Sequence, residues 1–532
     1  MSDIDVLIAG AGPIGLTAAI ELSRRAIRFR IVDPLLEPPQ YAKAVGVQPR
    51  TIEIFEGMGV ARQILDGSIP LIGQLVYVNG EQTGRMEMSL PSDVPFESVA
   101  IPQYATERIL TEHLRSLGGQ VERGTQLTAF TQDDDGVTAT LTSEGGEETV
   151  RARYLIGCDG AHSIVRKTLG LTFEGGAFTE QYMLGDVEVD WSLPRGYAIR
   201  ATHQTDGKVD DALICIPLPG RHRYRMSMLV PDDLASAPTG DKIAHGFEGS
   251  RKPELHHIQD VLDRLAPEPT TASNLRWSSV FRISHRIVDA YSKGRVFIAG
   301  DAAHIHPPTG AQGMNTGIQD AHNLAWKLAL AVDGIAADGL LDSYDLERRP
   351  VGEEVVGRTV RSAREGIGAG QKDPTYVARR EAQLLIDYSD SPVVTPTLAD
   401  GEGPVPGTRA PDSTGLRRES VVPDVRLYSL LSRRDHTTLI YAEDGADVNA
   451  FESLADLITT AAHGRMDVYV VAAPDAEVGD TTLPVLRDAA GEFARLYSPS
   501  PSEAFVLRPD GYLGYRGDSA AGITEHLRRI FR

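Results

Sequence analysis

The chain has little of what binds nucleic acid or crosses a membrane. Among its 532 residues, acidic side chains outnumber basic ones and give a formal net charge of −21. Affinity for nucleic acid comes largely from Lys and Arg that neutralise phosphates, so we expect no nucleic-acid partner. No uninterrupted apolar stretch reaches the length of a membrane-spanning helix, and we expect no membrane partner.

Cysteine is nearly absent, since the chain contains only Cys158 and Cys215. Two cysteines cannot form a disulfide framework, and this scarcity is typical of the reducing cytoplasm. Without a Cys-x-x-Cys pair, thiol redox chemistry is excluded. The N-terminus is apolar over residues 4–20, yet it carries Asp3 and Asp5 where a secretion signal has basic residues, which also favours a cytoplasmic protein.

Two further chemistries lack the residues that they need. His304 and His306 form a His-x-His pair, but no third ligand stands at a credible spacing, so we expect no metal site. We expect His304 to pack or to form a hydrogen bond. No Gly-x-Ser-x-Gly segment stands at the end of a predicted strand, so no acyl-transfer nucleophile is indicated.

Glycine, in contrast, is abundant and forms a turn near the N-terminus. An apolar run over residues 4–9 predicts a strand, and apolar residues at helical spacing predict a helix over residues 13–25. The turn between them has the G-x-G-x-x-G spacing with which a helix N-terminus binds a pyrophosphate. The residues expected to contact the cofactor here are Gly10, Gly12, Pro13 and Gly15.

An acidic residue follows at the distance that this turn requires. Residues 28–32 predict a second strand, which ends at Asp33. A carboxylate there can accept hydrogen bonds from the adenosine ribose hydroxyls. The combination predicts a Rossmann unit but leaves open whether the dinucleotide is FAD or NAD.

Two later segments repeat the combination of glycines with one carboxylate. Residues 154–157 and 294–300 predict strands, which are followed by Asp159 and Asp301. The last motif leads into a predicted helix over residues 316–332, whose N-terminus favours an anion such as reduced flavin. That dipole contributes about 0.3–1 kcal/mol and cannot be the whole catalyst. The expected flavin contacts in this motif are Gly300, Gly310, Gly313, Met314 and Asn315.

Together the three motifs resemble those of the FAD-dependent aromatic hydroxylases of the p-hydroxybenzoate and phenol hydroxylase type. Residues 294–330 are similar to their flavin-binding signature, and residues 159–166 match their middle motif without a departure. The resemblance implies a monooxygenase that holds FAD and consumes NAD(P)H as a transient co-substrate. It would hydroxylate a phenolic or polycyclic aromatic substrate with O₂ through a flavin C4a-hydroperoxide.

The resemblance also implies roles for single residues. It places Asp301 on the ribitol chain, and it makes Asp159 similar to an acid that serves both FAD and the passing nicotinamide. Pro307 would lie beside the flavin carbon that carries the peroxide. Backbone N–H groups near Pro307, Gly310 and Gly313 would stabilise the negative charge of that peroxide.

Four polar residues before the middle motif are further candidates for cofactor contacts. Gln103 and Arg108 resemble a neighbourhood that touches the sugar and phosphates of the flavin. At position 43 the family usually has an arginine, and Lys43 replaces that bidentate clamp by a point charge. Arg50 is either a cofactor contact or a residue at a helix start without a cofactor role.

The positions of the motifs predict an α/β protein of three parts. The first is a discontinuous Rossmann-like FAD-binding domain of the GR2 type, formed by residues 1–175 and 278–395. Residues 176–277, with part of 75–100, predict strands, and the resemblance implies that this inserted β-sheet domain binds the aromatic substrate. Its candidate substrate contacts, together with one residue of the third motif, are Tyr197, His222, Tyr224, Arg225, Met226 and Pro308.

Residues 396–532 begin with a linker rich in Gly and Pro and then predict a β-α-β…ββ-α order. They resemble the thioredoxin-like C-terminal domain of phenol hydroxylase relatives. We expect a structural role, such as a dimer contact, and the sequence leaves open whether the protein is a monomer or a homodimer.

Three alternative functions stay open. A flavin halogenase shares the fold, but its Gly-Trp-x-Trp-x-Ile-Pro segment is absent. A Baeyer–Villiger-type oxygenase, which inserts oxygen into a polycyclic ketone, would share every motif. The alternative of another class is a catalytically silent protein that binds FAD or a ligand.

Overall fold

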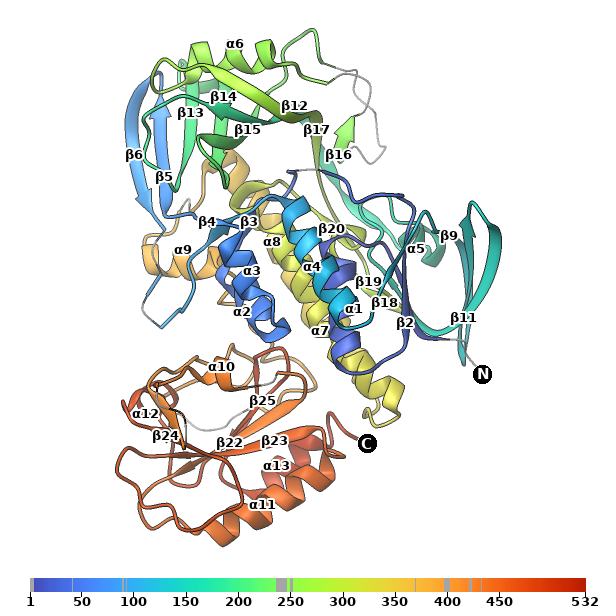
Figure 1. Ribbon diagram of the computed structural model, residues 1–532, viewed down its shortest axis with the longest axis vertical. Coiled ribbons are helices and arrows are strands. Elements are labelled where there is room, and N and C mark those ends of the chain that lie inside the picture. The colour runs from blue at the N-terminus through green and yellow to red at the C-terminus, as the bar shows by residue number, and fades with distance from the viewer. Residues whose placement is uncertain are drawn as a thin grey trace.

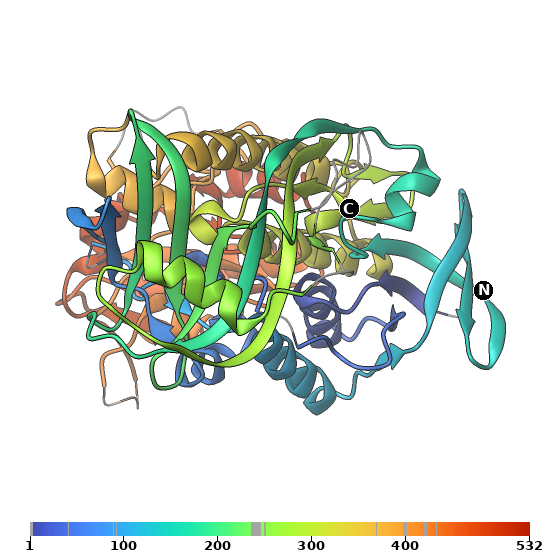
Figure 2. The same cartoon turned by 90° about the horizontal axis from the view of Figure 1, so that it is seen from above.

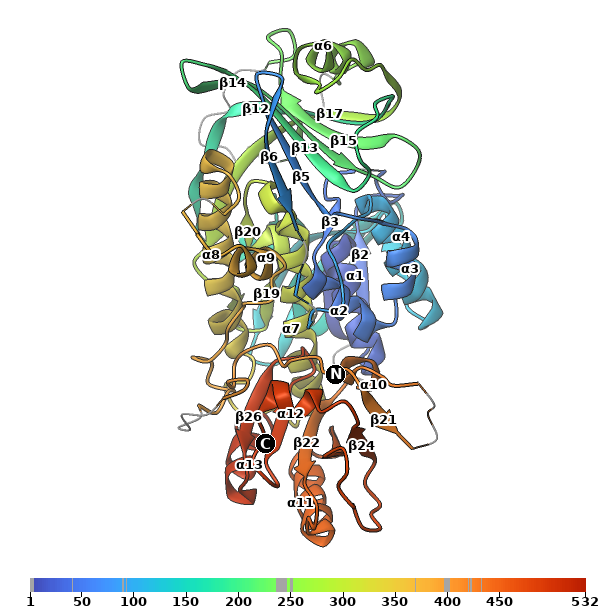
Figure 3. The same cartoon turned by 90° about the vertical axis from the view of Figure 1, so that its left-hand side faces the viewer.

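A computed structural model describes residues 4–40, 42–88, 90–91, 93–235, 246–248, 252–368, 370–396, 402–419, 421, 423–431 and 433–532. Three large sheets follow one another along the longest axis (Figure 1), and the side view in Figure 3 shows the same order. We call them the upper, central and C-terminal sheets. Within the described part of the chain, no helix is both long and apolar enough to cross a membrane.

The central sheet carries the three glycine motifs. Its strands are β1 (Ile4–Ala9), β2 (Phe29–Asp33), β8 (Val121–Arg123), β9 (Gln126–Asp133), β10 (Gly136–Ser143), β11 (Gly146–Gly157), β18 (Ser292–Lys293) and β19 (Val296–Ile298). The strands β2, β1, β11 and β19 are neighbours in this order and run parallel. Each glycine motif follows the carboxyl end of β1, β11 or β19. In open α/β sheets this edge binds the ligand.

Eight described helices lie on or beside the central sheet. They are α1 (Pro13–Arg24), α2 (Pro49–Met58), α3 (Ala61–Asp66), α4 (Gln103–Ser116), α5 (Ile164–Leu169), α7 (Gly313–Asp333), α8 (Ser343–Glu365) and α9 (Pro374–Glu381). The predicted helix over residues 13–25 is α1, and the one predicted over residues 316–332 is α7. α1 begins with Pro13, whose fixed φ suits the first helical position. A small three-stranded sheet beside them contains β3 (Gly46–Val47), β4 (Ile69–Pro70) and β7 (Val99–Ala100).

The upper sheet lies over the carboxyl edge of the central sheet. Its strands are β5 (Gly73–Val78), β6 (Glu81–Glu87), β12 (Phe173–Val189), β13 (Tyr197–Thr205), β14 (Lys208–Pro217), β15 (Arg223–Leu229), β16 (Gly246–Glu248), β17 (Ala272–Val288) and β20 (His304–Ile305). The sheet thus extends beyond the predicted bounds 176–277 at both ends. The expected participation of residues within 75–100 corresponds to β5 and β6.

The two faces of the upper sheet pack differently. Helix α6 (Leu255–Leu265) crosses the outer face, as Figure 2 shows from above. On β15, Tyr224 and Met226 are buried in the core that includes residues of α6. Because side chains alternate along a strand, Arg223 and Arg225 point to the opposite face, toward the central sheet.

The C-terminal sheet has the strand order β21-β24-β23-β22-β25-β26. Its strands are β21 (Leu416–Arg418), β22 (His436–Ala442), β23 (Met466–Ala472), β24 (Val485–Asp488), β25 (Ala504–Leu507) and β26 (Leu513–Gly517). The helices of this part are α10 (Leu427–Leu430), α11 (Val448–Ala461), α12 (Glu492–Tyr497) and α13 (Ala520–Leu527). The parallel pair β22–β23, with α11 between them in sequence, continues with the antiparallel β25–β26 and ends in α13, as the sequence predicts.

A buried cluster of charges joins the C-terminal sheet to the central part. Glu347 on α8 accepts hydrogen bonds from Lys327 on α7 (2.8 Å) and from both terminal nitrogens of Arg508 (2.7 and 2.8 Å). Asp510 also pairs with Arg508. Burial alone would raise the pKa of Glu347. The cations Arg508 and Lys327 outweigh this effect and hold the pKa well below its usual range. The fully buried Glu347 carboxylate therefore holds three segments together.

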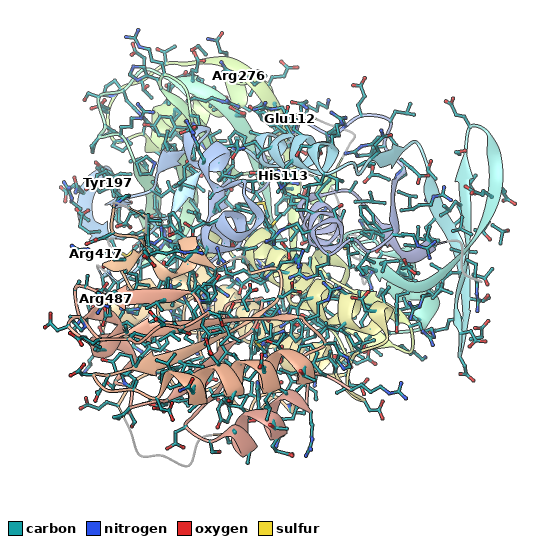
Figure 4. All side chains as sticks on the ribbon, turned by 60° about the horizontal axis from the view of Figure 1, so that its bottom comes forward. Glu112, His113, Tyr197, Arg276, Arg417 and Arg487 are labelled. Atoms are coloured by element: carbon teal, nitrogen blue, oxygen red, sulfur yellow. The ribbon has the colours of Figure 1, made fainter. Side chains whose placement is uncertain are left out.

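Removing the Glu347 charge should destabilise the fold, because Lys327 and Arg508 would keep their buried charges with less compensation. We expect Glu347→Gln to lower the free energy of unfolding by about 3–5 kcal/mol in chemical denaturation. The control is Arg417→Gln, which removes an exposed pair with Asp424 (Arg417 is labelled in Figure 4) and should cost less than about 1 kcal/mol. Equal effects of the two variants would contradict this role.

Candidate active site

A cavity of about 1190 Å³, its open mouth included, lies between the central and upper sheets. Its floor comes from the three glycine motifs and from the segment before β3. Its roof comes from the inward face of the upper sheet. One cavity is therefore lined by the glycine motifs and by the upper sheet.

The glycines of the first motif have two different roles. Gly12 and Pro13 line the cavity, and a Cβ on Gly12 would meet no atom within 4 Å. Gly10 and Gly15 lie behind the lining: a Cβ would approach the Cys158 carbonyl oxygen to 2.3 Å at Gly10 and the Gly10 carbonyl oxygen to 1.9 Å at Gly15. Gly12 therefore keeps the cavity open, whereas Gly10 and Gly15 let the backbone pack.

Asp33 lies at the end of β2, beside this turn. Its Oδ2 accepts the Ala11 N–H (2.8 Å), and its Oδ1 accepts the Leu35 N–H (3.0 Å) and pairs with Arg123 (3.1 Å). Asp33 is not part of the cavity lining. In this structure its carboxylate holds the turn, and its predicted contact with the ribose stays a prediction.

In the middle motif, Cys158 and Gly160 line the cavity, and Asp159 lies between them in the sequence. The Oδ2 atom of Asp159 accepts the N–H groups of Ile164 (2.7 Å) and Val165 (3.2 Å). Its Oδ1 is buried and has no hydrogen-bond partner among the described residues. Burial raises the pKa of Asp159. A buried oxygen without a donor fits a site that receives one from a ligand.

The third motif contributes Asp301, Pro308, Gly313 and Met314 to the lining. Oδ2 of Asp301 accepts a hydrogen bond from Lys43 Nζ (2.9 Å), so the two oppositely charged groups meet at the cavity. Gln103, the first residue of α4, also lines it. Seven of the residues predicted to bind the cofactor thus share one cavity: Gly12, Pro13, Lys43, Gln103, Asp301, Gly313 and Met314.

Other residues of the third motif support the floor without lining it. Pro308 lines the cavity and Pro307 does not. The Pro307 carbonyl accepts a hydrogen bond from His306 Nδ1 (2.8 Å). Gly310 has φ +73° and belongs to a tight turn outside the lining. Asn315 is fully buried, and its side chain bonds to Gly46 O (3.0 Å) and to the Gln48 N–H (2.9 Å).

Two predicted cofactor contacts lie elsewhere. Arg50 is buried against the C-terminal part, where it pairs with Glu53 (2.7 Å) and donates to the Asp510 carbonyl. Because its guanidinium is held there, it does not reach the cavity, and the reading as a residue at a helix start fits its place in α2. Arg108 is exposed on α4 and pairs with Glu112.

Of the substrate candidates on the upper sheet, only Arg225 lines the cavity. Tyr224 packs edge-to-face on Trp191 in the core below α6, on the opposite face of the sheet, and so cannot serve as predicted. Tyr197 and Met226 lie in the same core, and His222 is exposed in the turn before β15. Because side chains alternate along a strand, Arg225 and its two neighbours on β15 had to point to opposite faces, so at most one of the two sets could line the cavity.

Several lining residues were not predicted. Leu184 on β12 and Phe281 on β17 form the apolar part of the roof, and His306 and Gln312 lie on the floor. Burial lowers the pKa of His306 to about 4, so its ring is neutral at neutral pH. His304, as expected, forms a hydrogen bond, which joins its Nε2 to Asp320 (2.9 Å).

The cavity suits a dinucleotide with a flavin at one end. The N-termini of α1 and α7 both reach it, and neither has a side-chain cap, so their first N–H groups are available to an anion. Gly12 leaves space for a pyrophosphate, and the orphaned Oδ1 of Asp159 can accept a hydroxyl hydrogen. Asp301 adds one negative group to the lining of the cavity, and Lys43 adds one positive group.

Comparison with known proteins identifies the family. Residues 3–359 match the family described as FAD binding domain. The chain belongs to this family, that of the flavin-dependent monooxygenases. It is 32% identical over 99% of both chains to a flavin-dependent monooxygenase of Mycobacteroides abscessus. It is 31% identical, over 97% of this chain and 94% of the relative, to the pentachlorophenol 4-monooxygenase of Sphingobium chlorophenolicum.

Solved structures agree with this family. A ternary complex of aklavinone-11 hydroxylase with FAD and aklavinone superimposes with a TM-score of 0.78, at 26% identity over 99% of each chain. The predicted family, the fold class and FAD as the cofactor are thereby confirmed. The roles of individual cofactor residues in this monooxygenase stay predictions.

Gly12→Ala should weaken FAD binding without unfolding this monooxygenase. The added Cβ meets no protein atom, and the backbone at Gly12 (φ −75°) accepts alanine, but the methyl group enters the space assigned to the pyrophosphate. We expect the Kd for FAD to rise at least ~10-fold, measured by flavin fluorescence, with an unchanged melting temperature of the apoprotein. The control is Gly357→Ala, an open position in α8. Full FAD occupancy of Gly12→Ala would contradict the assignment.

A second prediction concerns Glu107, whose Oε1 accepts a hydrogen bond from Gln103 Nε2 (2.8 Å). Burial raises the pKa of Glu107 from 4.5 to about 7. The folded state therefore binds this proton more tightly than the unfolded state, and stability is lost as the pH rises from about 4.5 through 7. The shift corresponds to roughly 3 kcal/mol at pH 8.

Glu107→Gln removes this penalty, so its melting temperature should exceed that of the native holoprotein at pH 8. The difference should disappear near pH 5, as followed by calorimetry. Glu112→Gln, an exposed change on the same helix (Figure 4), should show no such pH dependence. A constant difference across this pH range for Glu107→Gln would show that the carboxyl is not protonated in the fold.

Proposed function

We propose that this flavin-dependent monooxygenase consumes NAD(P)H and O₂ to hydroxylate a phenolic or polycyclic aromatic substrate. The observation that carries the proposal is the division of one cavity into a floor of FAD motifs and a roof with apolar side chains. Leu184 and Phe281 give that roof a surface on which a flat aromatic ring can lie. The pentachlorophenol 4-monooxygenase among the relatives supports a phenolic substrate, and the aklavinone-11 hydroxylase supports hydroxylation.

FAD, when bound, would supply the oxygen chemistry, which transfers one atom of O₂ to the substrate. The protein supplies placement and charge stabilisation. The uncapped N–H groups at the start of α7, beside Gly313 and Met314, would stabilise negative charge at the reacting end. Pro308, Leu184 and Phe281 would exclude water there.

NAD(P)H is proposed as a reductant that binds and leaves. The sequence has one dinucleotide fingerprint, which lies between β1 and α1. A transient reductant needs no second fingerprint. The choice between NADH and NADPH is part of the experiment below.

The proposal predicts that a suitable phenol accelerates NAD(P)H oxidation by the holoprotein. We would measure the oxidation of NADH and of NADPH with a panel of phenols and polycyclic aromatics, including pentachlorophenol, and analyse the products by mass. A productive substrate should raise the rate at least ~10-fold and yield a product with a new ring hydroxyl. An ester or lactone would identify Baeyer–Villiger oxygenation instead. Equal rates with and without every compound would refute the proposal and favour a silent FAD-binding protein.

A further inference from the structure

The roof of the cavity contains one cation that the protein leaves without a counter-ion. Arg225 on β15 lines the cavity and is only 5% exposed. Its Nε is buried without a hydrogen-bond partner, and no hydrogen bond or ion pair joins its guanidinium to any described residue. Burial lowers the pKa of Arg225 to about 10, which still leaves it charged at neutral pH. A buried charge without a partner is costly for a fold to keep.

The nearby carboxylate does not neutralise Arg225. Asp186 on β12 lies directly across from Arg225 in the sheet. Both of its oxygens, however, are bound by the guanidinium of Arg223, which donates through Nε (2.7 Å) and through its second terminal nitrogen. Arg223 also donates to the Tyr104 hydroxyl (3.1 Å) and so ties the roof to α4. The two arginines lie on the same strand and the same face of the sheet. Arg223 has a carboxylate partner, whereas Arg225 has none among the described residues.

The other charged side chains and the amide side chains that line the cavity have partners within the floor. Lys43 pairs with Asp301, and Gln103 bonds to Glu107 and to the Ala44 N–H. Gln312 likewise donates to the carbonyl oxygens of Gly310 and Glu381. These partners leave the roof guanidinium as a donor group that points into the cavity and still needs an acceptor.

The register of the strands places apolar groups in line with Arg225. Leu184 pairs with Ser227, two residues beyond Arg225 on β15, and Phe281 pairs with Tyr182, two residues from Leu184 on β12. Diagonal neighbours in a sheet are ~7–8 Å apart, so the row from Arg225 through Leu184 to Phe281 covers roughly 15 Å. A row of this length matches a fused aromatic system with a polar group at one end.

We infer that Arg225 binds an ionised phenolic oxygen of the substrate and thereby selects acidic phenols, with the rings lying along Leu184 and Phe281. This inference rests on the proposed function, because it names the chemical class of the substrate for the same site. A hydrogen bond from a guanidinium to an anionic oxygen is about twice as strong as one between neutral groups. Ionisation of the phenol also enriches the ring in electrons, which suits attack by an electrophilic oxygen.

The test uses binding alone, without reductant, so that it is independent of turnover. Oxidised holoprotein is titrated at pH 8 with pentachlorophenol, which is ionised, and with pentachloroanisole, its methyl ether, which has the same ring but cannot ionise. Binding is followed by the change in flavin absorbance. We expect the native protein to bind the phenolate at least ~10-fold more tightly than the ether, the scale of a hydrogen bond to a charged group.

Arg225→Gln should remove most of this preference by weakening phenolate binding ~10-fold or more, while the Kd of the ether changes less than about 3-fold. Arg225→Lys should retain part of it, because a point charge replaces the planar donor pair. FAD content should stay unchanged in both variants. The control is Arg276→Gln, on the same sheet but exposed and paired with Glu188 (Figure 4), which should leave both ligands unaffected.

The melting temperature provides an independent test of whether the Arg225 charge lacks a counter-ion. Without ligand, Arg225→Met should melt about 2 °C or more above the native holoprotein, since it removes an uncompensated buried cation. With pentachlorophenol present, this advantage should shrink or reverse, because the native protein gains binding energy that the variant lacks.

Four results would overturn the inference. They are equal affinity of the native protein for phenolate and ether, absence of phenolate binding, unchanged phenolate affinity in Arg225→Gln, and loss of FAD from that variant. The last result would assign the guanidinium to the cofactor. If instead these binding results hold but no phenol stimulates NAD(P)H oxidation, the proposed function fails while the anion site at Arg225 stands.

Discussion

The architecture depends on a close approach of backbones that no side chain could enter. At Gly317 in α7, a Cβ would lie 2.9 Å from the Cα of Gly300, and at Gly10 it would lie 2.3 Å from the Cys158 carbonyl oxygen. These contacts bring the ends of β1, β11 and β19 and the start of α7 together. As a result, the uncapped N-termini of α1 and α7 reach a single cavity, although their residues are far apart in the sequence.

Buried charges then fix α7 in this position along its length. Asp320 accepts the Gly300 N–H (3.1 Å) and pairs with Arg348 on α8 (2.8 Å), which ties the third motif to two helices. Nearly two turns before the end of α7, Lys327 pairs with Glu347 and, through it, with the C-terminal part. The C-terminal domain thus contributes to the site indirectly, by holding the helix whose first residues form the cavity floor. This supports the structural role expected from its lack of cysteine.

The sequence predicted the floor well because the cofactor constrains it locally. A turn that packs backbone against a phosphate needs glycine at set spacings, and so Gly12 and Asp301 could be placed in the cavity from the pattern alone. The same pattern could not separate Pro307 from Pro308, since the direction of each ring depends on how the segment folds. The position of Arg50 could not be predicted either. It donates a hydrogen bond to the Asp510 carbonyl in the C-terminal part, and a local sequence pattern does not indicate a contact with so distant a segment.

The roof was harder to predict because a strand pattern gives two faces without saying which one the substrate meets. On β15, Tyr224 and Arg225 are adjacent and looked equally suitable, yet one packs below α6 and the other lines the cavity. Hydrophobicity does not resolve the choice, because the inward face carries an arginine and the outward face the apolar core. Only the pairing of Arg223 with Asp186 shows which charge is used by the fold and which one is left over.

The floor and the roof of the cavity can therefore change independently of each other. A substitution on the floor disturbs backbone packing or the cofactor, so the residues there are constrained together. A substitution on the inward face of the upper sheet changes the polarity opposite the flavin and leaves the outer core and α6 untouched, because alternate residues of a strand serve separate faces. On the proposed function, substrate choice could therefore vary on this scaffold without a change in oxygen chemistry, and the charge proposed to bind the substrate at position 225 would be one such variable.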